Sequence, residues 1–319
     1  MKKKIVVLGA GESGAGSAVL ALKKGFDVFV SDFGMIKDKY KKILDDNSIR
    51  WEEGKHSTDE IMTASEVIKS PGVPESSPFV KSLREKGIPV ISEIEFAGRY
   101  ASGKKICVTG SNGKTTVTNL ICHILKKAGL DVAMTGNVGN SFAMAVAERD
   151  YDYYVIELSS FQLDGMYDFR ADIAILMNIT PDHLDRYGYN LQNYVDSKMR
   201  VTRNQRSTDY FIYWADDPII RSELTKADFN MIRLPFSTTT REGMGAFIDE
   251  EKIIIDYPNK TDLMTIHDLA LKGRHNVFNS MAAAITGQVL NIRKDIIRES
   301  LADFQGVEHR LEPVISVAG

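Results

Sequence analysis

The chain has 319 residues, of which 43% are hydrophobic and 26% are charged, and its formal net charge is −3. This near-neutral balance excludes a polybasic nucleic-acid coat or membrane binder, and no apolar run approaches the roughly 18 residues of a spanning helix. The two cysteines, Cys107 and Cys122, lack the spacing of a disulfide framework, so each is expected in a hydrophobic core. We expect a cytoplasmic, monomeric globular protein that binds neither nucleic acid nor membrane.

Short β-branched runs alternate with amphipathic stretches along the chain, which indicates an α/β fold. The segments that we predict as strands are residues 4–9, 27–32, 67–70, 105–110, 153–157 and 173–179. Continuous apolar strands of this kind favour parallel sheets that are covered on both faces. Ligands bind beyond the carboxyl ends of such strands, so functional residues are expected just after each of them.

The first strand runs into a glycine loop, GAGESG at residues 9–14, which matches the pattern G-x-G-x-x-G. Asp32 ends the next strand, where a dinucleotide-binding fold has an acid for a ribose hydroxyl. This spacing predicts a loop that binds a diphosphate, but a UDP-sugar fits it as readily as NAD. Glu12 opposes a phosphate, so its side chain is expected to point outward.

The strand at 67–70 ends in SPGVP, residues 70–74, a stiff polar turn that either lines a ligand or is a plain turn. A domain boundary is predicted near residue 94, between the two glycine loops of the chain. It divides residues 1–93, a Rossmann-like N-terminal domain, from residues 94–302, a P-loop-type mononucleotide-binding α/β domain.

The second glycine loop, GSNGKTT at residues 110–116, follows a strand and opens a helix. Its backbone N–H groups are expected to surround a phosphate, Lys114 to reach the β- and γ-phosphates, and Thr115 to ligate Mg²⁺. Val108 stands where the usual G-x-x-x-x-G-K-[ST] pattern has its first glycine. Nucleotide binding remains the better interpretation than a turn with a solvated lysine, because the strand and helix flank the loop.

Polar residues follow two further strands that we expect beside this loop. Glu157 ends the apolar run at 153–157, where a buried carboxylate needs a partner, either a metal or a helix N-terminus. His183 follows the strand at 173–179 between Asp182 and Asp185, and it is either a structural histidine or a second metal ligand. Lys198 falls on a predicted helix, where a solvated surface lysine is the ordinary interpretation.

These motifs, in this order, resemble the Mur ligase family over the whole chain. The family-level segments are GSNGKTT at 110–116, NVG at 137–139, TPDHLDRY at 180–187, GRHNVFN at 273–279 and His309 with Arg310. ELSSFQL at 157–163, SPGVP at 70–74 and the first glycine loop are most similar to the members that add D-glutamate to UDP-N-acetylmuramoyl-L-alanine. Ser111 departs from the family's usual threonine but keeps the hydroxyl.

The resemblance implies a role for each matching residue. The ATP-binding residues would be Gly110, Ser111, Asn112, Gly113, Lys114, Thr115, Thr116, Asn276 and Arg310. The UDP-substrate would be held by Ser13, Gly14, Asp32, Ser70, Gly72, Asn137 and His183. Thr115, Glu157, His183 and a carbamylated Lys198 would ligate Mg²⁺, and Lys114, His183 and Lys198 would be the catalytic residues.

The implied reaction is ATP-driven amide formation through an acyl phosphate, in the synthesis of a peptidoglycan precursor. The family has a further C-terminal domain that supplies the D-glutamate pocket, and residues 303–319 would be its start. We therefore expect this chain to bind the UDP-substrate but to ligate poorly.

Three alternatives remain at this point. An NAD-dependent oxidoreductase would use the first glycine loop but would leave Lys114, Glu157 and His183 without a joint purpose. A nucleotide-binding module without catalysis would need only the two loops. A related ligase that adds another amino acid is the nearest competitor, because the amino-acid pocket is expected in the C-terminal domain.

Overall fold

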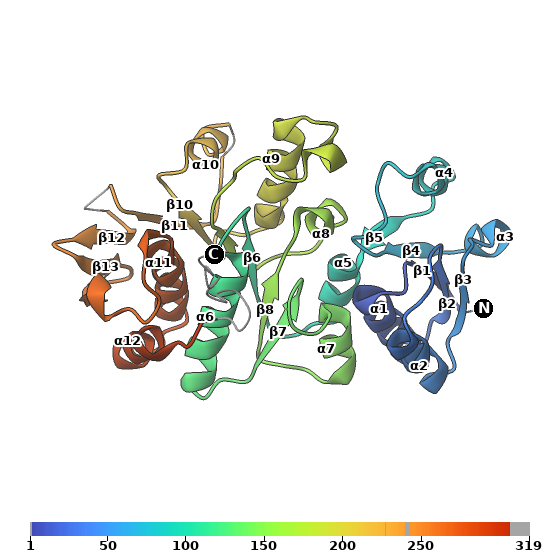
Figure 1. Cartoon of the computed structure of the whole chain (residues 1–319), viewed down its shortest axis with the longest axis horizontal. Helices are drawn as coiled ribbons and strands as arrows, with labels where there is room; N and C mark the ends of the chain where they lie inside the picture. The colour runs from blue at the N-terminus through green and yellow to red at the C-terminus, as the bar shows by residue number, and fades with distance from the viewer. Residues whose placement is uncertain (1, 227, 240–242, 307–319) are drawn as a thin grey trace, which may run out of the picture.

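The computed structural model describes residues 2–226, 228–239 and 243–306. Two α/β lobes lie side by side, the N-terminal lobe in blue and cyan and the larger lobe in green to red (Figure 1). Each lobe is built around its own sheet, as the alternation of apolar strands and amphipathic stretches predicted.

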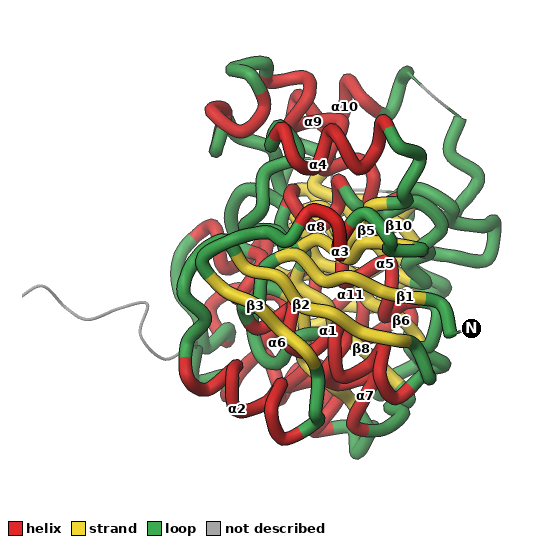
Figure 2. Tube along the Cα trace, turned by 90° about the vertical axis from the view of Figure 1, so that its right-hand side faces the viewer, coloured by secondary structure: helices red, strands yellow, loops and turns green. Residues whose placement is uncertain are grey.

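The N-terminal lobe contains a five-stranded sheet with the strand order β3-β2-β1-β4-β5, and all of its neighbouring strands are parallel. The strands are β1 (Lys4–Leu8), β2 (Asp27–Asp32), β3 (Arg50–Glu53), β4 (Glu66–Lys69) and β5 (Val90–Ser92). The helices are α1 (Glu12–Lys23), α2 (Asp38–Asp46), α3 (Thr58–Ile61) and α4 (Pro78–Glu85). Figure 2 looks onto this sheet, with the larger lobe behind it.

The larger lobe contains a nine-stranded sheet with the order β14-β13-β12-β11-β10-β9-β6-β8-β7. Its strands are β6 (Lys104–Thr109), β7 (Val132–Gly136), β8 (Tyr153–Glu157), β9 (Ile173–Leu176), β10 (Tyr210–Trp214), β11 (Ile232–Ser237), β12 (Gly245–Asp249), β13 (Lys252–Asp256) and β14 (Lys260–Thr265). Strand β6 lies between β8 and β9, so the residues that follow these three strands meet at one edge of the sheet.

Helices cover this sheet on both faces. They are α6 (Lys114–Lys127), α7 (Phe142–Glu148), α8 (Ser160–Asp164), α9 (Leu191–Met199), α10 (Pro218–Glu223), α11 (Arg274–Val289) and α12 (Lys294–Asp303). Helix α5 (Glu93–Gly98) lies between the two lobes, next to α1 and α7. Short 3-10 helices span Leu184–Tyr187, Arg200–Thr202 and Ile266–Asp268. Within the described residues, none of these helices is long and apolar enough to cross a membrane.

The six predicted strands are confirmed as β1, β2, β4, β6, β8 and β9. The helix after the second glycine loop is also confirmed, and it begins at Lys114, at the glycine loop itself. Both cysteines are buried and unpaired, as predicted. These six strands pair parallel, as expected, whereas β12, β13 and β14, which the sequence analysis did not predict, pair antiparallel at the far edge. Hairpin turns of a few residues join these strands, so no covering helix is needed between them.

The lobes pack through α1 and α5 against α7, and one cluster of buried hydrophobic residues extends across both sheets. Helix α1 approaches α7 closely, since a Cβ on Gly16 would lie 2.0 Å from Ser141 Oγ. Glu95, which is 1% exposed, accepts the backbone N–H groups of three successive residues, 167–169. The predicted boundary near residue 94 lies within α5 and stays a prediction, and the run at 311–319 lies outside the described residues.

Candidate active site

The second glycine loop is held in place by side chains that follow β9. Asn178 Oδ1 accepts the N–H of Asn112 at 2.8 Å, and Asn178 Nδ2 donates to the carbonyl of Asn112 at 3.0 Å. Ser111 Oγ donates to the carbonyl of Thr180 at 2.8 Å and accepts the N–H of Thr180 at 2.9 Å. These hydrogen bonds fix the conformation of the loop, with the N-terminus of α6 behind it.

Two lysines meet at the carbonyl oxygen of Gly110. Lys114 Nζ donates to it at 3.0 Å and Lys198 Nζ donates to it at 2.8 Å, although the two side chains come from different helices. Lys198 is only 2% exposed, which corrects its ordinary interpretation as a surface lysine. Burial, together with the charge of Lys114, lowers the pKa of Lys198 to about 7. The Lys114 cation beside a ring of backbone N–H groups suits a polyphosphate.

Glu157 ends β8 directly beside the strand that leads into this loop, where it pairs in register with Val108. It is 1% exposed, and its Oε1 accepts a hydrogen bond from Asn137 Nδ2 at 3.0 Å. The backbone N–H of Asn137 donates to the carbonyl of Glu157 at 2.9 Å. Within the part of the chain that the structure describes, Glu157 Oε2 is buried with no hydrogen-bond partner. A buried carboxylate oxygen without a donor fits a cation.

The residues that the sequence predicted as metal ligands do not form a closed protein cage. Among residues 2–226, 228–239 and 243–306, no group of three or more His, Cys, Asp or Glu side chains could hold a metal ion. Mg²⁺ ordinarily takes one or two carboxylates and completes its shell with water and substrate phosphates. Glu157 and the buried Thr115 fit an ion of this kind, which would arrive with the nucleotide.

His183 lies apart from the buried group in this structure. Its side chain is 58% exposed, and its Nε2 lies 3.5 Å from Asp182 Oδ2. The ring centroid lies 5.4 Å from that of Phe161, which follows β8. The residue adopts a left-handed backbone conformation with φ at 49° in the turn before Leu184–Tyr187. The structure thus puts His183 on the surface near β8, and its predicted role as a ligand remains a prediction.

Helix α11 contributes the predicted residue Asn276 and a second asparagine, Asn279, that the sequence analysis did not single out. Asn276 Nδ2 donates to the carbonyl of Lys272 at 2.8 Å, and Asn276 Oδ1 accepts Asn279 Nδ2 at 3.1 Å. A Cβ on Gly113 would lie 2.6 Å from Asn279 Oδ1, which leaves no room for a side chain. Gly113 also has a φ of 85°, a left-handed conformation that favours glycine. Asn279 therefore faces the second glycine loop directly, and its place at the end of the GRHNVFN segment was the available signal.

Arg310 was predicted to contact the nucleotide, and it lies outside the described residues.

The first glycine loop is braced by the two side chains that end β2 and follow β4. Asp32 Oδ2 accepts the N–H of Ala10 at 2.6 Å, and Ser70 Oγ donates to the carbonyl of Gly9 at 2.8 Å. A Cβ on Gly14 would lie 1.9 Å from that same carbonyl oxygen. Asp32 therefore supports the loop backbone in this structure. The G-x-G-x-x-G pattern predicted only that this acid would bind a ribose hydroxyl.

Ser13 and Gly72 differ in their surroundings. Gly72 is open, with no atom within 4 Å of where its Cβ would lie. Ser13 lies next to Glu93, a fully buried carboxyl that also accepts the N–H of Ala143 at 2.9 Å. Burial raises the pKa of Glu93 to about 7, while hydrogen bonds from Ala143, Ser13 and Ser141 oppose the rise.

Two segments that were predicted to bind the UDP-substrate, one from each lobe, lie next to each other. Arg186 Nη2, in the turn after His183, donates to the carbonyl of Pro71 at 3.3 Å. The Arg186 guanidinium also lies 4.3 Å from the centroid of the Phe161 ring. The turn of the larger lobe and the SPGVP segment of the N-terminal lobe are therefore neighbours, although more than a hundred residues separate them along the chain.

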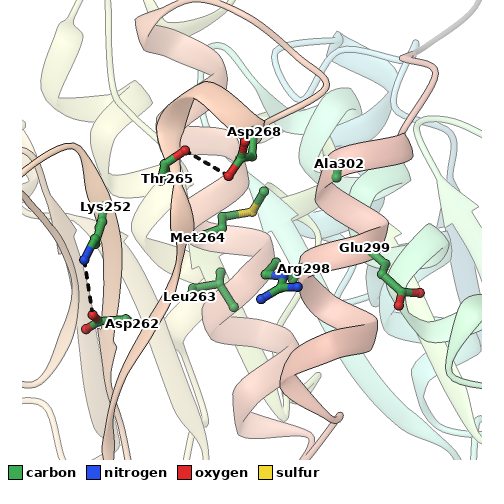
Figure 3. A pocket seen from close by; sticks show the side chains of 9 residues that line it. All are labelled: Lys252, Asp262, Leu263, Met264, Thr265, Asp268, Arg298, Glu299 and Ala302. Atoms are coloured by element: carbon green, nitrogen blue, oxygen red, sulfur yellow. Dashed lines mark hydrogen bonds and ion pairs between the residues drawn. The ribbon is translucent and has the colours of Figure 1, made fainter.

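The larger lobe also contains two cavities. One of about 630 Å³ lies between the β13–β14 hairpin and α12, where Lys252 pairs with Asp262 and Thr265 bonds to Asp268 (Figure 3). None of its lining residues is a predicted site residue. The other, of about 620 Å³, includes Gly273 at the start of α11.

Comparison with known proteins agrees with this arrangement. Residues 3–92 match the Mur ligase MurD-like N-terminal domain, and residues 108–287 match the Mur ligase middle domain. The chain belongs to the Mur ligase family. It is therefore an enzyme of the ligase class, and these matches give the oxidoreductase alternative no support.

Two curated relatives of this Mur ligase chain are named UDP-N-acetylmuramoylalanine--D-glutamate ligase. The protein from Bacteroides fragilis is 58% identical over 317 residues, which are 99% of this chain and 71% of that protein. The protein from Bacteroides thetaiotaomicron is 56% identical over the same shares of the two chains. The N-terminal and middle regions of these relatives are thus the parts that this chain matches.

Solved structures with the same fold are more distant in sequence. The UDP-N-acetylmuramate:L-alanyl-gamma-D-glutamyl-meso-diaminopimelate ligase from Neisseria meningitides has a TM-score of 0.66 at 20% identity, covering 97% of this chain and all of that chain. A murein peptide ligase from Psychrobacter arcticus has a TM-score of 0.64 at 20% identity, covering 97% of this chain and 70% of that chain. At such identities the likeness shows that this Mur ligase chain shares their fold.

Proposed function

We propose that this Mur ligase uses ATP to join D-glutamate to UDP-N-acetylmuramoyl-L-alanine in the synthesis of a peptidoglycan precursor. The names of the Bacteroides relatives support the two substrates. The observation that carries the ATP-dependent reaction is the meeting of Lys114 and Lys198 at the Gly110 carbonyl, beside the unpartnered oxygen of Glu157. Cations and an acid that accepts a metal are the groups that phosphoryl transfer needs.

In this proposal, the backbone N–H groups of residues 110–116 bind the ATP phosphates, and Lys114 neutralises the charge on the β- and γ-phosphates. Thr115 and Glu157 would hold Mg²⁺, which supplies further charge neutralisation at the phosphates when bound. Asn276 and Asn279 at the start of α11 would lie along the nucleotide, since Asn279 faces Gly113. Arg310 keeps its predicted role as a nucleotide contact.

The chemistry requires no nucleophile from the protein. A carboxylate oxygen of the alanyl group attacks the γ-phosphorus of ATP, the bond to the β-phosphate oxygen breaks, and ADP leaves. The amine of D-glutamate then attacks the acyl carbon, loses a proton and expels inorganic phosphate, so that an amide forms. The residues named here would act by orienting the reactants and by offsetting charge. We assign no described residue to D-glutamate.

The UDP-substrate would extend from the first glycine loop toward the second. Gly14 and the N-terminus of α1 suit the diphosphate, and the open Gly72 suits a ligand that passes over the SPGVP turn. The contact of Arg186 with Pro71 supports such a path, because it joins the turn of His183 to the N-terminal lobe. Asn137, which is hydrogen-bonded to Glu157, would lie at the reacting end.

Lys198 would act after reaction with carbon dioxide, as a carbamate whose oxygens ligate a second Mg²⁺. Its burial next to Thr109 and Gly110 keeps the amine at the phosphate loop rather than in solvent. The test is a carbon NMR spectrum of the chain in labelled bicarbonate. A carbamate signal that disappears in Lys198→Arg but persists in Lys69→Arg, another buried lysine, supports the role. Persistence of the signal in Lys198→Arg contradicts it.

The function is tested by calorimetric titration of the chain with UDP-N-acetylmuramoyl-L-alanine, with Mg·ATP and with NADH. Each tenfold difference in affinity corresponds to about 1.4 kcal/mol, so even a hundredfold preference is unambiguous. We expect binding of the UDP-substrate and of Mg·ATP, and no binding of NADH. Selective binding of NADH would contradict the ligase proposal, and a failure to bind the UDP-substrate would refute the assignment of the first glycine loop.

A further inference from the structure

The carboxyl of Glu93 lies buried where the two lobes meet. Glu93 is the first residue of α5, and α5 packs against both α1 and α7 at the junction of the lobes (Figure 1). It is 1% exposed, and its Oε1 accepts the N–H of Ala143 at 2.9 Å. Among the residues that the structure describes, Glu93 Oε2 is buried with no hydrogen-bond partner. A charged oxygen is costly in such a place, whereas a protonated one is a hydrogen-bond donor.

Two hydroxyl groups act on this carboxyl, one from each lobe. Ser13 is the second residue of α1 and belongs to the first glycine loop, and Ser141 precedes α7 in the larger lobe. Both hydroxyls favour the charged form, but burial outweighs them and raises the pKa of Glu93 to about 7. Ser141 Oγ already accepts the N–H of Met144 at 3.0 Å. Ser13 is therefore the better acceptor for a hydrogen bond from a protonated carboxyl.

The other ionisable groups around α5 have partners of their own, apart from two exposed acids. Glu12, which is exposed, adds a negative charge that also raises the pKa of Glu93. The remaining ionisable side chains on α5 and on the elements packed against it are Glu95, Lys23, Glu148, Asp164, Glu66 and Lys69. Glu148 is exposed, and each of the others has a hydrogen bond or an ion pair to a group other than Glu93.

We propose that Glu93, in its protonated form, is a positioning residue that directs the hydroxyl of Ser13 toward the diphosphate of the UDP-substrate. This inference rests on the proposed function, because it takes the first glycine loop as the diphosphate site. Neutral Glu93 donates a hydrogen bond from Oε2 to Ser13 Oγ, which leaves the hydroxyl hydrogen of Ser13 for a phosphate oxygen. A charged Glu93 accepts that hydrogen itself, and the side chain of Ser13 then has no donor left for the ligand.

The charge of Glu93 also changes the electrostatic field at the first glycine loop. The N-terminus of α1 has a partial positive charge and unpaired backbone N–H groups, which suit an anion. Residues 9–14 contain no lysine or arginine that could replace this contribution. A carboxylate beside Ser13 would offset the partial charge of the helix, whereas a carboxylic acid leaves it available. The diphosphate should therefore bind most tightly when Glu93 holds its proton.

The first experiment measures the affinity of the wild type for UDP-N-acetylmuramoyl-L-alanine by calorimetry at about pH 6 and about pH 8. The diphosphate of this ligand is esterified at both ends, so its own charge is constant over the range. The neutral fraction of Glu93 falls from about nine-tenths to about one-tenth between these pH values. We expect the affinity to fall about fivefold, and an unchanged affinity would overturn the inference.

Glu93→Gln separates the proton from the fold. The amide oxygen can accept the N–H of Ala143, and the amide nitrogen can donate to Ser13 as the protonated acid does. This variant should match the wild type at about pH 6 and keep that affinity at about pH 8. Glu12→Gln, which removes a carboxylate from the same loop, is the matched control and should keep the fall. A fall of wild-type size in Glu93→Gln, or a loss of affinity at both pH values, would contradict the proposal.

Ser13→Ala tests the other partner of this contact. Loss of the hydroxyl should weaken binding of the UDP-substrate about tenfold at about pH 6, and little pH dependence should remain. Ser17→Ala removes a buried hydroxyl that donates to the carbonyl of Ser13 one turn along the same helix, and it should keep the pH dependence. If Ser13→Ala retains the full fall in affinity, Ser13 is not the group that responds to Glu93.

A measurement on the unmodified chain decides the matter if the variants fail to fold. At about pH 8 most of the Glu93 carboxyls are charged, so binding of the UDP-substrate should take up about half a proton per chain. Calorimetry in two buffers with different ionisation enthalpies measures this uptake. Binding with no uptake of protons would overturn the inference.

The outcomes separate this inference from the proposed function. If the wild type binds the UDP-substrate equally well at both pH values, the role of Glu93 is wrong and the ligase proposal is untouched. If the wild type binds the UDP-substrate at neither pH, the assignment of the first glycine loop fails and the role of Glu93 fails with it.

Discussion

The two glycine loops of this chain share a backbone plan and differ in charge. Each follows a parallel strand, opens a helix and is braced by a side chain from the end of a neighbouring strand, Asp32 in one lobe and Asn178 in the other. The first loop, residues 9–14, contains the acid Glu12 and no lysine or arginine. The second has Lys114 and Lys198 at one carbonyl oxygen. The same fold element can thus be directed to different ligands by the side chains that surround it.

The difference matches the two substrates that we propose. A triphosphate with its metal carries dense negative charge. At the second loop Lys114 offsets that charge, and the Glu157 carboxylate accepts the metal. A nucleotide-sugar carries less charge over a longer molecule. The first loop is then left with backbone N–H groups and the N-terminus of α1.

The largest effect is expected for the charge at the second loop. Lys114→Met should weaken Mg·ATP binding by about hundredfold, because a hydrogen bond to a charged group contributes up to about 3 kcal/mol. Affinity for UDP-N-acetylmuramoyl-L-alanine should not change. Calorimetry measures both. Lys126→Met, an exposed lysine at the other end of the same helix, is the control. Equal loss in both variants would mean that net charge, rather than the position of Lys114, governs binding.

A clash with the backbone of the first loop should impair UDP binding and leave Mg·ATP binding intact. In Gly14→Ala the new methyl group would lie 1.9 Å from the carbonyl oxygen of Gly9, whereas Gly11→Ala meets no atom within 4 Å. Overpacking of this kind costs about 1–3 kcal/mol, so Gly14→Ala should lower the free energy of unfolding and weaken UDP binding. Mg·ATP binding should survive. Gly11→Ala should keep the wild-type free energy of unfolding, and a similar loss of stability in both glycine variants would contradict the packing argument.

The carboxyl of Glu93, beside Ser13 in the first loop and near Glu12, makes stability depend on pH. Burial raises its pKa to about 7 from an ordinary 4.5, so the folded chain binds this proton more tightly than the unfolded chain does. The stabilisation is complete below pH 4.5 and is lost as the pH rises through about 7. The free energy of unfolding should therefore fall by an amount on the order of 2 kcal/mol.

Glu93→Gln keeps an oxygen that accepts the N–H of Ala143 but cannot ionise, so it should remove this fall. Urea unfolding at about pH 5 and about pH 8 measures it. Glu85→Gln, at an exposed glutamate, should keep the wild-type dependence. A full fall in Glu93→Gln would assign the pH dependence to other groups.

The smallest effect is expected where one hydrogen bond braces the first loop. Ser70→Ala removes the donor to the carbonyl of Gly9, which should cost about 1 kcal/mol and weaken UDP binding about fivefold. Ser82→Ala removes a comparable bond, to the carbonyl of Phe79 in α4, and should leave UDP binding unchanged. If both variants weaken UDP binding equally, the effect comes from general loss of stability.

The sequence by itself determined the parts of this protein that depend on local patterns. The apolar runs predicted the strands of both sheets around the glycine loops, and the glycine spacing predicted where phosphates would bind. Lys114 was recognisable because it stands at a set distance from its loop, and Glu157 because it ends a buried strand. Each of these signals lies within one strand–loop–helix unit.

Only the tertiary structure decided which residues from distant segments of the chain contact each other. Lys198 is a polar residue on a helix in the sequence, and its burial at Gly110 follows from the way α9 packs over the second loop. Asn279 at Gly113, and Arg186 at Pro71, likewise join segments that are far apart along the chain. A sequence pattern reports the faces of one element, whereas burial and pKa depend on which other element covers that face.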